Sequence, residues 1–178
     1  EEDLVKLEKL GLNIIYLGIE SGSDEVLQDV KKGATAAEII EAGKKVKRTG
    51  IKLSVTLISG LGGKEKWQMH AVESAKVING INPDYLGLLT LMVERNVEMY
   101  DKVQNGEMTL LSAQEVMLET REFISNLEVS NCVFRSNHAS NYIPLSATLN
   151  EEKEELLAKL DKCIEENHGY KDDFYRRL

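Results

Sequence analysis

The feature that most constrains the fold of this chain is a pair of apolar runs that each end abruptly in a glycine-containing polar turn. They cover residues 13–23 (NIIYLGIESGS) and 54–65 (SVTLISGLGGKE). Such runs, rich in Ile, Leu, Val and Thr and bounded by glycines, are typical of buried strands. A helix-like segment follows each run, so the repeated strand–helix units predict a parallel sheet. Because ligands bind at the carboxyl ends of such strands, we expect the turns 20–23 and 59–65 to face one pocket.

Four strand–helix units can be followed along the chain. The strands are expected at 14–19, 51–59, 84–93 and 131–135. Two capping boxes, Thr35 with Glu38 and Ser112 with Glu115, mark helix starts, and Asn150 is expected to cap the last helix. A complete eight-stranded barrel needs about 250 residues. The sequence therefore predicts an α/β fold, a partial TIM-like (β/α) barrel of about four parallel strands with flanking helices.

The expected domain organisation is a single domain over residues 1–178. Two polar segments without readable periodicity, 94–111 and 136–145, are expected to be long substrate-side loops, and 168–178 a loose tail. Loops of that length in compact domains are often functional. A partial barrel leaves open sheet edges, which natural proteins avoid. We therefore expect another polypeptide segment, or a second copy in a homo-oligomer, to cover the open edge.

Composition excludes several classes of protein. The net charge of −8 and the pI near 5.0 argue against a nucleic-acid-binding surface, so no nucleic-acid partner is expected. The sequence contains no run of about 18 apolar residues, so no membrane span is predicted. The acidic start lacks the apolar core of a signal peptide. Cys132 and Cys163 fit no metal-binding spacing and are expected to be reduced thiols. A cytoplasmic location is expected.

The segments YLGIESGSDEVL, with KKG downstream, and GIKLSVTLISGLGGKE are specific enough to suggest a family. They resemble the C-terminal half of the core of the radical S-adenosylmethionine (radical SAM) superfamily. The resemblance is greatest to the branch of Elongator-type and oxygen-independent coproporphyrinogen oxidase-like Fe–S oxidoreductases. It covers residues 13–92 well and 93–145 more loosely. It implies the fourth, fifth and sixth strands of a barrel that binds S-adenosylmethionine and a small-molecule substrate.

The resemblance also assigns cofactor contacts near the first strand. The polar residue that ends the family's fourth strand corresponds to Glu20, with Ser21 beside it. The family's basic residue that meets the methionyl carboxylate corresponds to Lys32, where Arg is usual and would bind a carboxylate bidentately. Without the resemblance, Glu20 would be read as a carboxylate that accepts turn N–H groups, and Lys32 as a surface cation at a helix end.

Further cofactor contacts fall on the later strands. Thr56 matches a position that meets the ribose, and Ile58 matches the apolar residue that contacts adenine. Gly60 begins the glycine-rich turn, which alone would indicate only a tight turn with positive φ. The backbone contact of the sixth strand is expected at Leu89.

The cluster-binding motif of the family is absent. Its [4Fe–4S] cluster is held by three cysteines in a CxxxCxxC motif, and no such motif occurs in this sequence. The resemblance therefore implies that this chain holds no metal and that its missing partner is the N-terminal half of the barrel. The full-length protein would bind the cluster, generate a 5′-deoxyadenosyl radical and abstract hydrogen from the substrate. This chain alone is expected to be inactive.

Substrate contacts are expected in the polar run after the fourth strand. Arg135, His138 and Asn141 cluster there, and an Arg near a polar loop suits a carboxylate or phosphate group. The catalytic residues themselves cannot be assigned from the sequence, and a lone His is often structural. His70, inside an expected helix, is interpreted as a packed or surface residue.

Two other classes of function remain open. One is a non-redox barrel lyase or isomerase, in which Glu20 would act as a general base and a strand-end Lys would form a Schiff base. No Lys, however, lies in the middle or at the carboxyl end of the expected strands. The other is a non-catalytic module that binds a nucleoside or a partner protein.

Overall fold

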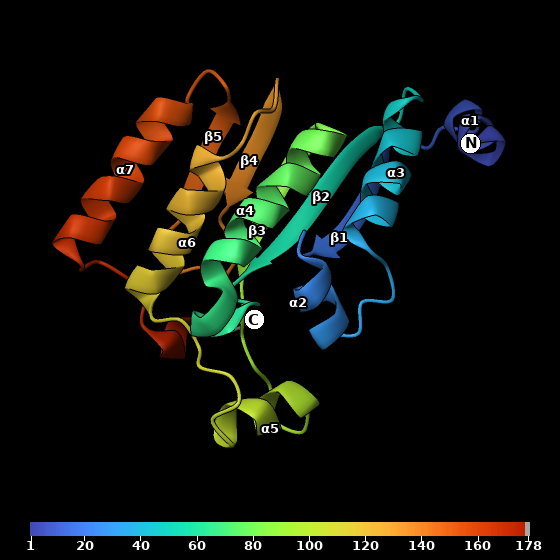
Figure 1. Ribbon diagram of the computed structural model, residues 1–178. Helices are drawn as coiled ribbons and strands as arrows, with labels where there is room; N and C mark the ends of the chain where they lie inside the picture. Colours follow the sequence, from blue (N-terminus) through green and yellow to red (C-terminus); the bar gives the residue numbers. More distant parts are fainter. Residues whose placement is uncertain (177–178) are drawn as a thin grey trace.

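The computed structural model describes residues 1–176 of the chain and contains one five-stranded sheet. The strands lie in the order in which they occur in the sequence, and Figure 1 shows them side by side: β1 (Ile14–Glu20), β2 (Lys52–Ser59), β3 (Tyr85–Thr90), β4 (Cys132–Ser136) and β5 (Leu145–Leu149). β1 to β4 are parallel, and β5 runs antiparallel to β4. The predicted α/β partial barrel is confirmed, with an antiparallel edge strand that the sequence did not predict.

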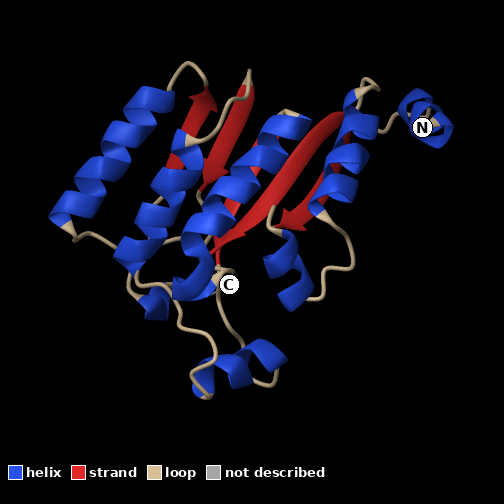
Figure 2. Cartoon of the chain, in the orientation of Figure 1, coloured by secondary structure: helices blue, strands red, loops and turns tan. Residues whose placement is uncertain are grey.

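The main helices pack on one side of the sheet, as Figure 2 shows. They are α2 (Asp24–Asp29), α3 (Ala36–Lys47), α4 (Gly63–Ile81), α6 (Ala113–Ser125) and α7 (Lys153–Glu166). Within residues 1–176 the opposite face has no covering helix, and Tyr16 and Tyr85 on that face are 74% and 40% exposed. This helix-free face of the sheet is where the interior of a closed barrel would lie.

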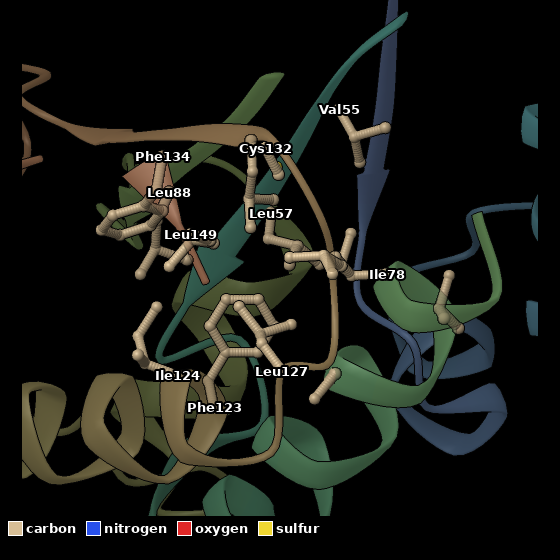
Figure 3. Packing of buried hydrophobic residues seen from close by; sticks show 14 of the residues in the cluster. Val55, Leu57, Ile78, Leu88, Phe123, Ile124, Leu127, Cys132, Phe134 and Leu149 are labelled. Carbon is tan, nitrogen blue, oxygen red and sulfur yellow. The ribbon is translucent and has the colours of Figure 1, made fainter. Parts of the chain in front are cut away.

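The core lies between the sheet and its helices. Alternate residues of each strand point to this side, as a two-residue period requires. They include Val55 and Leu57 of β2 and Cys132 and Phe134 of β4, which are all buried and belong to one hydrophobic cluster with Phe123 of α6, as labelled in Figure 3. The sequence folds in this way because each strand offers one continuous apolar face to the amphipathic helices.

Both capping boxes form as predicted. The side chains of Thr35 and Ser112 accept hydrogen bonds from the backbone N–H groups of Glu38 and Glu115, and each Glu side chain bonds back to the N-cap. The prediction for the last helix is wrong. α7 has Glu152 as its N-cap, because Asn150 adopts a positive φ of 82° in the turn after β5.

The remaining elements lie outside the two layers. α1 (Glu2–Lys9) precedes β1, and α5 (Glu98–Gln104) lies beyond the carboxyl ends of the parallel strands in Figure 1, within the segment expected to be a loop at 94–111. The segment 136–145 links β4 to β5. Of the expected tail 168–178, the last two residues lie outside the described part, and 168–176 contains a short 3₁₀ helix at Asp173–Tyr175. No helix within residues 1–176 combines the length and apolarity that crossing a membrane requires.

Candidate functional site

One row of paired residues crosses the helix-free face of the sheet near the carboxyl ends of the strands. Gly18 of β1 pairs with Thr56 of β2, which pairs with Gly87 of β3, which pairs with Arg135 of β4. A Cβ atom on Gly87 would lie 3.1 Å from Cγ2 of Thr56. In this row Thr56 is therefore flanked on both sides by glycines, which carry no side chain.

A β-bulge at the end of β1 places Glu20 beside this row of residues. The pairing with β2 shifts between Gly18 and Glu20, and Glu20 adopts a φ of 64°. A Cβ atom on Gly18 would lie 2.6 Å from the Glu20 Oε1 atom and 3.6 Å from Thr56 Oγ1. The Glu20 carboxylate thus lies above Gly18, on the side of Thr56. A non-glycine residue in the left-handed region stores about 1 kcal/mol or more of strain, and such residues often mark functional sites.

Lys32 joins this group from the end of α2. Its Nζ atom lies 3.1 Å from Glu20 Oε1, so the two residues that were expected to contact the cofactor form an ion pair. Ser21 does not share this surface. It is buried, and its hydroxyl accepts a hydrogen bond from the Ser23 N–H at 3.0 Å inside the turn.

A cavity of about 1210 Å³ opens at the carboxyl ends of β2 and β3. Four of the predicted residues line it: Ile58, Gly60, Leu89 and His138. Its other walls come from the segment after β3, from α5, from the loop between β4 and β5 and from the C-terminal segment, including Arg95, Tyr100, Tyr142 and Arg176. Arg95, Tyr100 and Arg176 had no readable pattern in the sequence, because they come from segments that only the fold brings together.

His138 is held in one orientation by Ser140. The Ser140 N–H donates to His138 Nδ1 at 3.2 Å, and the Ser140 hydroxyl lies 2.9 Å from the same atom. The Ser140 oxygen accepts the N–H of Thr90 at 3.1 Å, so its own proton is free to bond to Nδ1. Since Nδ1 accepts hydrogen bonds, the neutral ring carries its proton on Nε2. His138 therefore offers an N–H donor at the cavity wall.

The other two residues expected to bind substrate do not line the cavity. Asn141 is buried, and its amide is used within the fold, because Oδ1 accepts from the Thr90 hydroxyl at 2.9 Å and Nδ2 donates to the Leu88 carbonyl at 2.8 Å. Arg135 lies on the helix-free face, in the row of Thr56, and one of its N–H groups donates to the Phe134 carbonyl at 2.9 Å. Asn141 thus joins the loop to β3, whereas Arg135 remains accessible.

The C-terminal segment closes one side of the cavity. Arg176 is buried and stacks on the Tyr142 ring at 3.7 Å from its centroid. Its Nε atom donates to the Ser140 carbonyl at 2.6 Å, and one terminal N–H donates to the Leu91 carbonyl at 3.3 Å. These bonds tie the segment to the His138 loop and to the end of β3.

Residues 1–176 provide no cluster of His, Cys, Asp and Glu side chains that could hold a metal ion. Burial raises the pKa of the Cys132 thiol to about 12, and a metal-binding thiolate is therefore disfavoured at that position. The described residues do not provide a ligand set for an iron–sulfur cluster.

Comparisons with known proteins give a consistent picture. Residues 1–74 match the model of the radical SAM superfamily. The chain is 24% identical to a tRNA uridine(34) acetyltransferase of Methanocaldococcus jannaschii, over 96% of this chain and 31% of that protein. It is 36% identical to a putative methylthiotransferase of the same organism, over 33% of this chain and 13% of that protein. Its fold resembles that of Methanocaldococcus infernus Elp3 carrying an N-terminal deletion, with a TM-score of 0.66, 20% identity, and 94% and 39% of the two chains covered.

These findings confirm the resemblance to the radical SAM superfamily, of Elongator type. The chain spans about a third of the length of the first of these relatives. The superfamily implies S-adenosylmethionine and a [4Fe–4S] cluster in the full-length protein. The findings do not support a coproporphyrinogen oxidase-like specificity. They also weigh against the expectation of no nucleic-acid partner, since the first relative is named for a tRNA base. Net charge alone does not decide this point, because it averages over the whole surface.

Proposed function

We propose that this chain is the part of a radical SAM enzyme that holds S-adenosylmethionine and a tRNA uridine. One observation carries the proposal. Glu20, Thr56 and Ile58 gather at the carboxyl ends of parallel strands on the helix-free face, beside a cavity that Ile58, Gly60 and Leu89 line. The carboxyl ends of parallel strands are where barrel enzymes bind their ligands.

The chemistry of these residues fits S-adenosylmethionine. The Lys32 ammonium and the Glu20 carboxylate complement the carboxylate and ammonium of the methionyl group. The Thr56 hydroxyl lies on the helix-free face, where it can hydrogen-bond to a ribose, and the apolar Ile58 side chain suits an adenine face. When bound beside a reduced cluster, this cofactor supplies a carbon-centred radical that abstracts hydrogen.

The remainder of the barrel has a place to attach. β1 is an edge strand of the sheet, so its outer backbone N–H and C=O groups lack a neighbouring strand within residues 1–176. We infer that the cluster-binding part of the full-length protein pairs with this edge. That arrangement also covers the helix-free face and keeps water away from the radical.

The cavity suits a nucleobase. Tyr100 and Tyr142 line it and offer aromatic surface on which a base can stack, and the Nε2–H of His138 can donate to a uracil carbonyl. The name of the first relative, a tRNA uridine(34) acetyltransferase, supports a uridine substrate. The volume of about 1210 Å³ is large enough for a nucleotide together with part of the cofactor.

Within the described residues, no contact favours the lyase or isomerase alternative. Lys52 lies at the first residue of β2, far from the carboxyl end, and its Nζ atom is paired with Asp84 at 3.1 Å. The hydrogen bond that Lys52 donates to Asp84 holds its ammonium at the wrong end of the sheet for a Schiff base in the cavity.

The test uses the full-length protein, reconstituted anaerobically with iron and sulfide, and measures S-adenosylmethionine binding and the release of 5′-deoxyadenosine with and without tRNA. We expect the Thr56→Val variant to bind the cofactor about tenfold more weakly, since it loses one hydrogen bond and leaves a polar ligand group unpaired. The matched control is Thr148→Val, the same substitution on β5. A loaded protein that binds no S-adenosylmethionine contradicts the cofactor assignment, and cleavage that is indifferent to tRNA contradicts the substrate assignment.

A further inference from the structure

Two buried polar side chains of α4 lie one helical turn apart beneath the candidate site. His70 and Ser74 are separated by four residues, so they lie on the same face of the helix. They are 3% and 2% exposed. Each is linked to a different turn at the carboxyl end of the sheet.

His70 acts through Glu119 of α6. Its Nδ1 atom lies 2.9 Å from Glu119 Oε1, and Glu119 Oε2 accepts the Gly60 N–H at 2.6 Å and the Ser59 hydroxyl. Glu119 is only 2% exposed and lies among Leu57, Leu88 and Phe123. Its three hydrogen bonds therefore hold the first residue of the glycine-rich turn from the side opposite the cavity.

Ser74 acts directly on the other turn. Its hydroxyl accepts the Gly22 N–H at 2.9 Å. Gly22 lies so close to α4 that an added Cβ atom would be 2.4 Å from the Glu73 carbonyl oxygen. The turn after β1, which carries Glu20, is thus seated on the same helix face that supports the turn after β2.

A carboxylate in such surroundings is costly unless it is well hydrogen-bonded, and an apolar residue of similar size would pack there at lower cost. The His70 Nε2 atom has no hydrogen-bond partner among the described residues, and the adjacent cavity of about 10 Å³ has room for about one water molecule at most. We therefore expect the network to fix the position of the Gly60 turn more than to raise the free energy of unfolding.

We propose that Glu119, His70 and Ser74 are positioning residues that hold the turns after β1 and β2 at a fixed separation, so that both contact one cofactor molecule. The inference rests on the proposed function, because it assumes that both turns bind S-adenosylmethionine. None of the three residues reaches the cavity surface that the ligand would occupy. They act through the backbone N–H groups of Gly60 and Gly22.

The test uses the full-length protein with its cluster and measures two quantities: amide hydrogen exchange at Gly60 and Gly22, resolved by mass spectrometry, and the Kd for S-adenosylmethionine. We expect Glu119→Ala to speed exchange at Gly60 by about tenfold or more and to raise the Kd by about tenfold. Glu119→Gln keeps an oxygen that accepts the Gly60 N–H and an amide that can donate to His70. It should restore both quantities to within about threefold of the original protein.

Two further variants separate positioning from loss of stability. Ser74→Ala should speed exchange at Gly22 and raise the Kd while leaving exchange at Gly60 unchanged. Ile124→Val trims a buried side chain of the same helix as Glu119 and should leave the Kd unchanged although it lowers stability. If Glu119→Ala leaves the exchange rate at Gly60 or the Kd unchanged, or if Glu119→Gln does not restore them, the inference is overturned. A protein that binds no S-adenosylmethionine overturns the proposed function, whereas the exchange rates still decide whether the network holds the turns.

Discussion

The Nζ atom of Lys32 lies 3.1 Å from the Oε1 atom of Glu20, so an ion pair joins the segment that follows α2 to the end of β1. The two side chains are 28% and 27% exposed, which leaves both charges accessible to a ligand. A zwitterionic amino-acid group can bind here because it presents a carboxylate to Lys32 and an ammonium to Glu20. Without a ligand, the Lys32 ammonium and the Glu20 carboxylate compensate each other's charge.

The first prediction concerns this pair. Lys32→Met should raise the Kd for S-adenosylmethionine about tenfold or more, because a charge-assisted hydrogen bond is lost, whereas Lys32→Arg should retain most of the affinity. Stability should change by less than about 1 kcal/mol, since partly exposed ion pairs contribute little. Titration calorimetry on the full-length protein measures the affinity. Lys31→Met is the matched control, because it removes the neighbouring charge, which pairs with Glu98 on α5. Equal losses in the two Met variants would refute a specific role for Lys32.

The second prediction uses the backbone strain at Glu20. Glycine adopts a φ of 64° without penalty, whereas alanine does not. Glu20→Gly should therefore be more stable than Glu20→Ala by about 1 kcal/mol, while both variants lose affinity for the cofactor to the same extent. Urea unfolding and titration calorimetry measure the two effects. An alanine variant as stable as the glycine variant would mean that Glu20 is not strained.

Much of the fold was predictable from local patterns. The four parallel strands overlap the apolar runs expected to form them, and both capping boxes form, because these signals are local in the sequence. β5 was missed because Leu145–Leu149 is short and its pairing with β4 is decided by a tertiary contact. The segment expected to be a loop at 94–111 contains α5, whose seven residues carry no buried apolar face that could have revealed it.

The candidate site was harder to predict, because burial depends on the assembled fold. Asn141 was expected to bind substrate from its place in a polar run, yet both ends of its amide are bonded to β3. Glu119 resembles any surface charge of a helix, and only the packing of α6 on the sheet buries it under Gly60. Nothing in the local sequence distinguishes such a residue from its exposed neighbours.

The third prediction concerns the close contact of Gly22 with α4. Gly22→Ala should lower the free energy of unfolding by about 3 kcal/mol, because the added methyl group meets backbone atoms that cannot move aside easily. The contrasting variant is Gly80→Ala. Gly80 lies within α4, and a Cβ added there would be 3.3 Å from the flexible Ile40 side chain. There the gain in helix propensity of about 1 kcal/mol should offset the contact. Urea unfolding compares the two variants, and a neutral Gly22→Ala would show that the turn is not seated on α4.

The fourth prediction concerns the tautomer of His138. The imidazole should carry its proton on Nε2, which ¹⁵N chemical shifts of labelled histidine report directly. Ser140→Ala removes the hydroxyl that bonds to Nδ1 but keeps the backbone N–H, so the same tautomer should persist with a less ordered ring. If His138 donates to the substrate, His138→Phe should raise the KM for tRNA without changing the Kd for S-adenosylmethionine. A proton found on Nδ1 would contradict the arrangement described for the loop.

The fifth prediction concerns pH and the start of α6. The Lys64 ammonium and the Ser112 backbone N–H lower the pKa of Glu115 from 4.5 to about 2. A carboxyl group whose pKa is lower in the folded state stabilises the protein above its unfolded pKa, and this stabilisation is lost as the pH falls through the folded pKa. Glu115→Gln should therefore cost about 1 kcal/mol at neutral pH, and the difference from the original protein should shrink as the pH falls from about 4.5 towards 2. Urea unfolding between about pH 7 and pH 3 measures it, with Glu151→Gln as the control for loss of an exposed charge. A difference that stays constant over this range would mean that the ionised form of Glu115 does not hold the helix start.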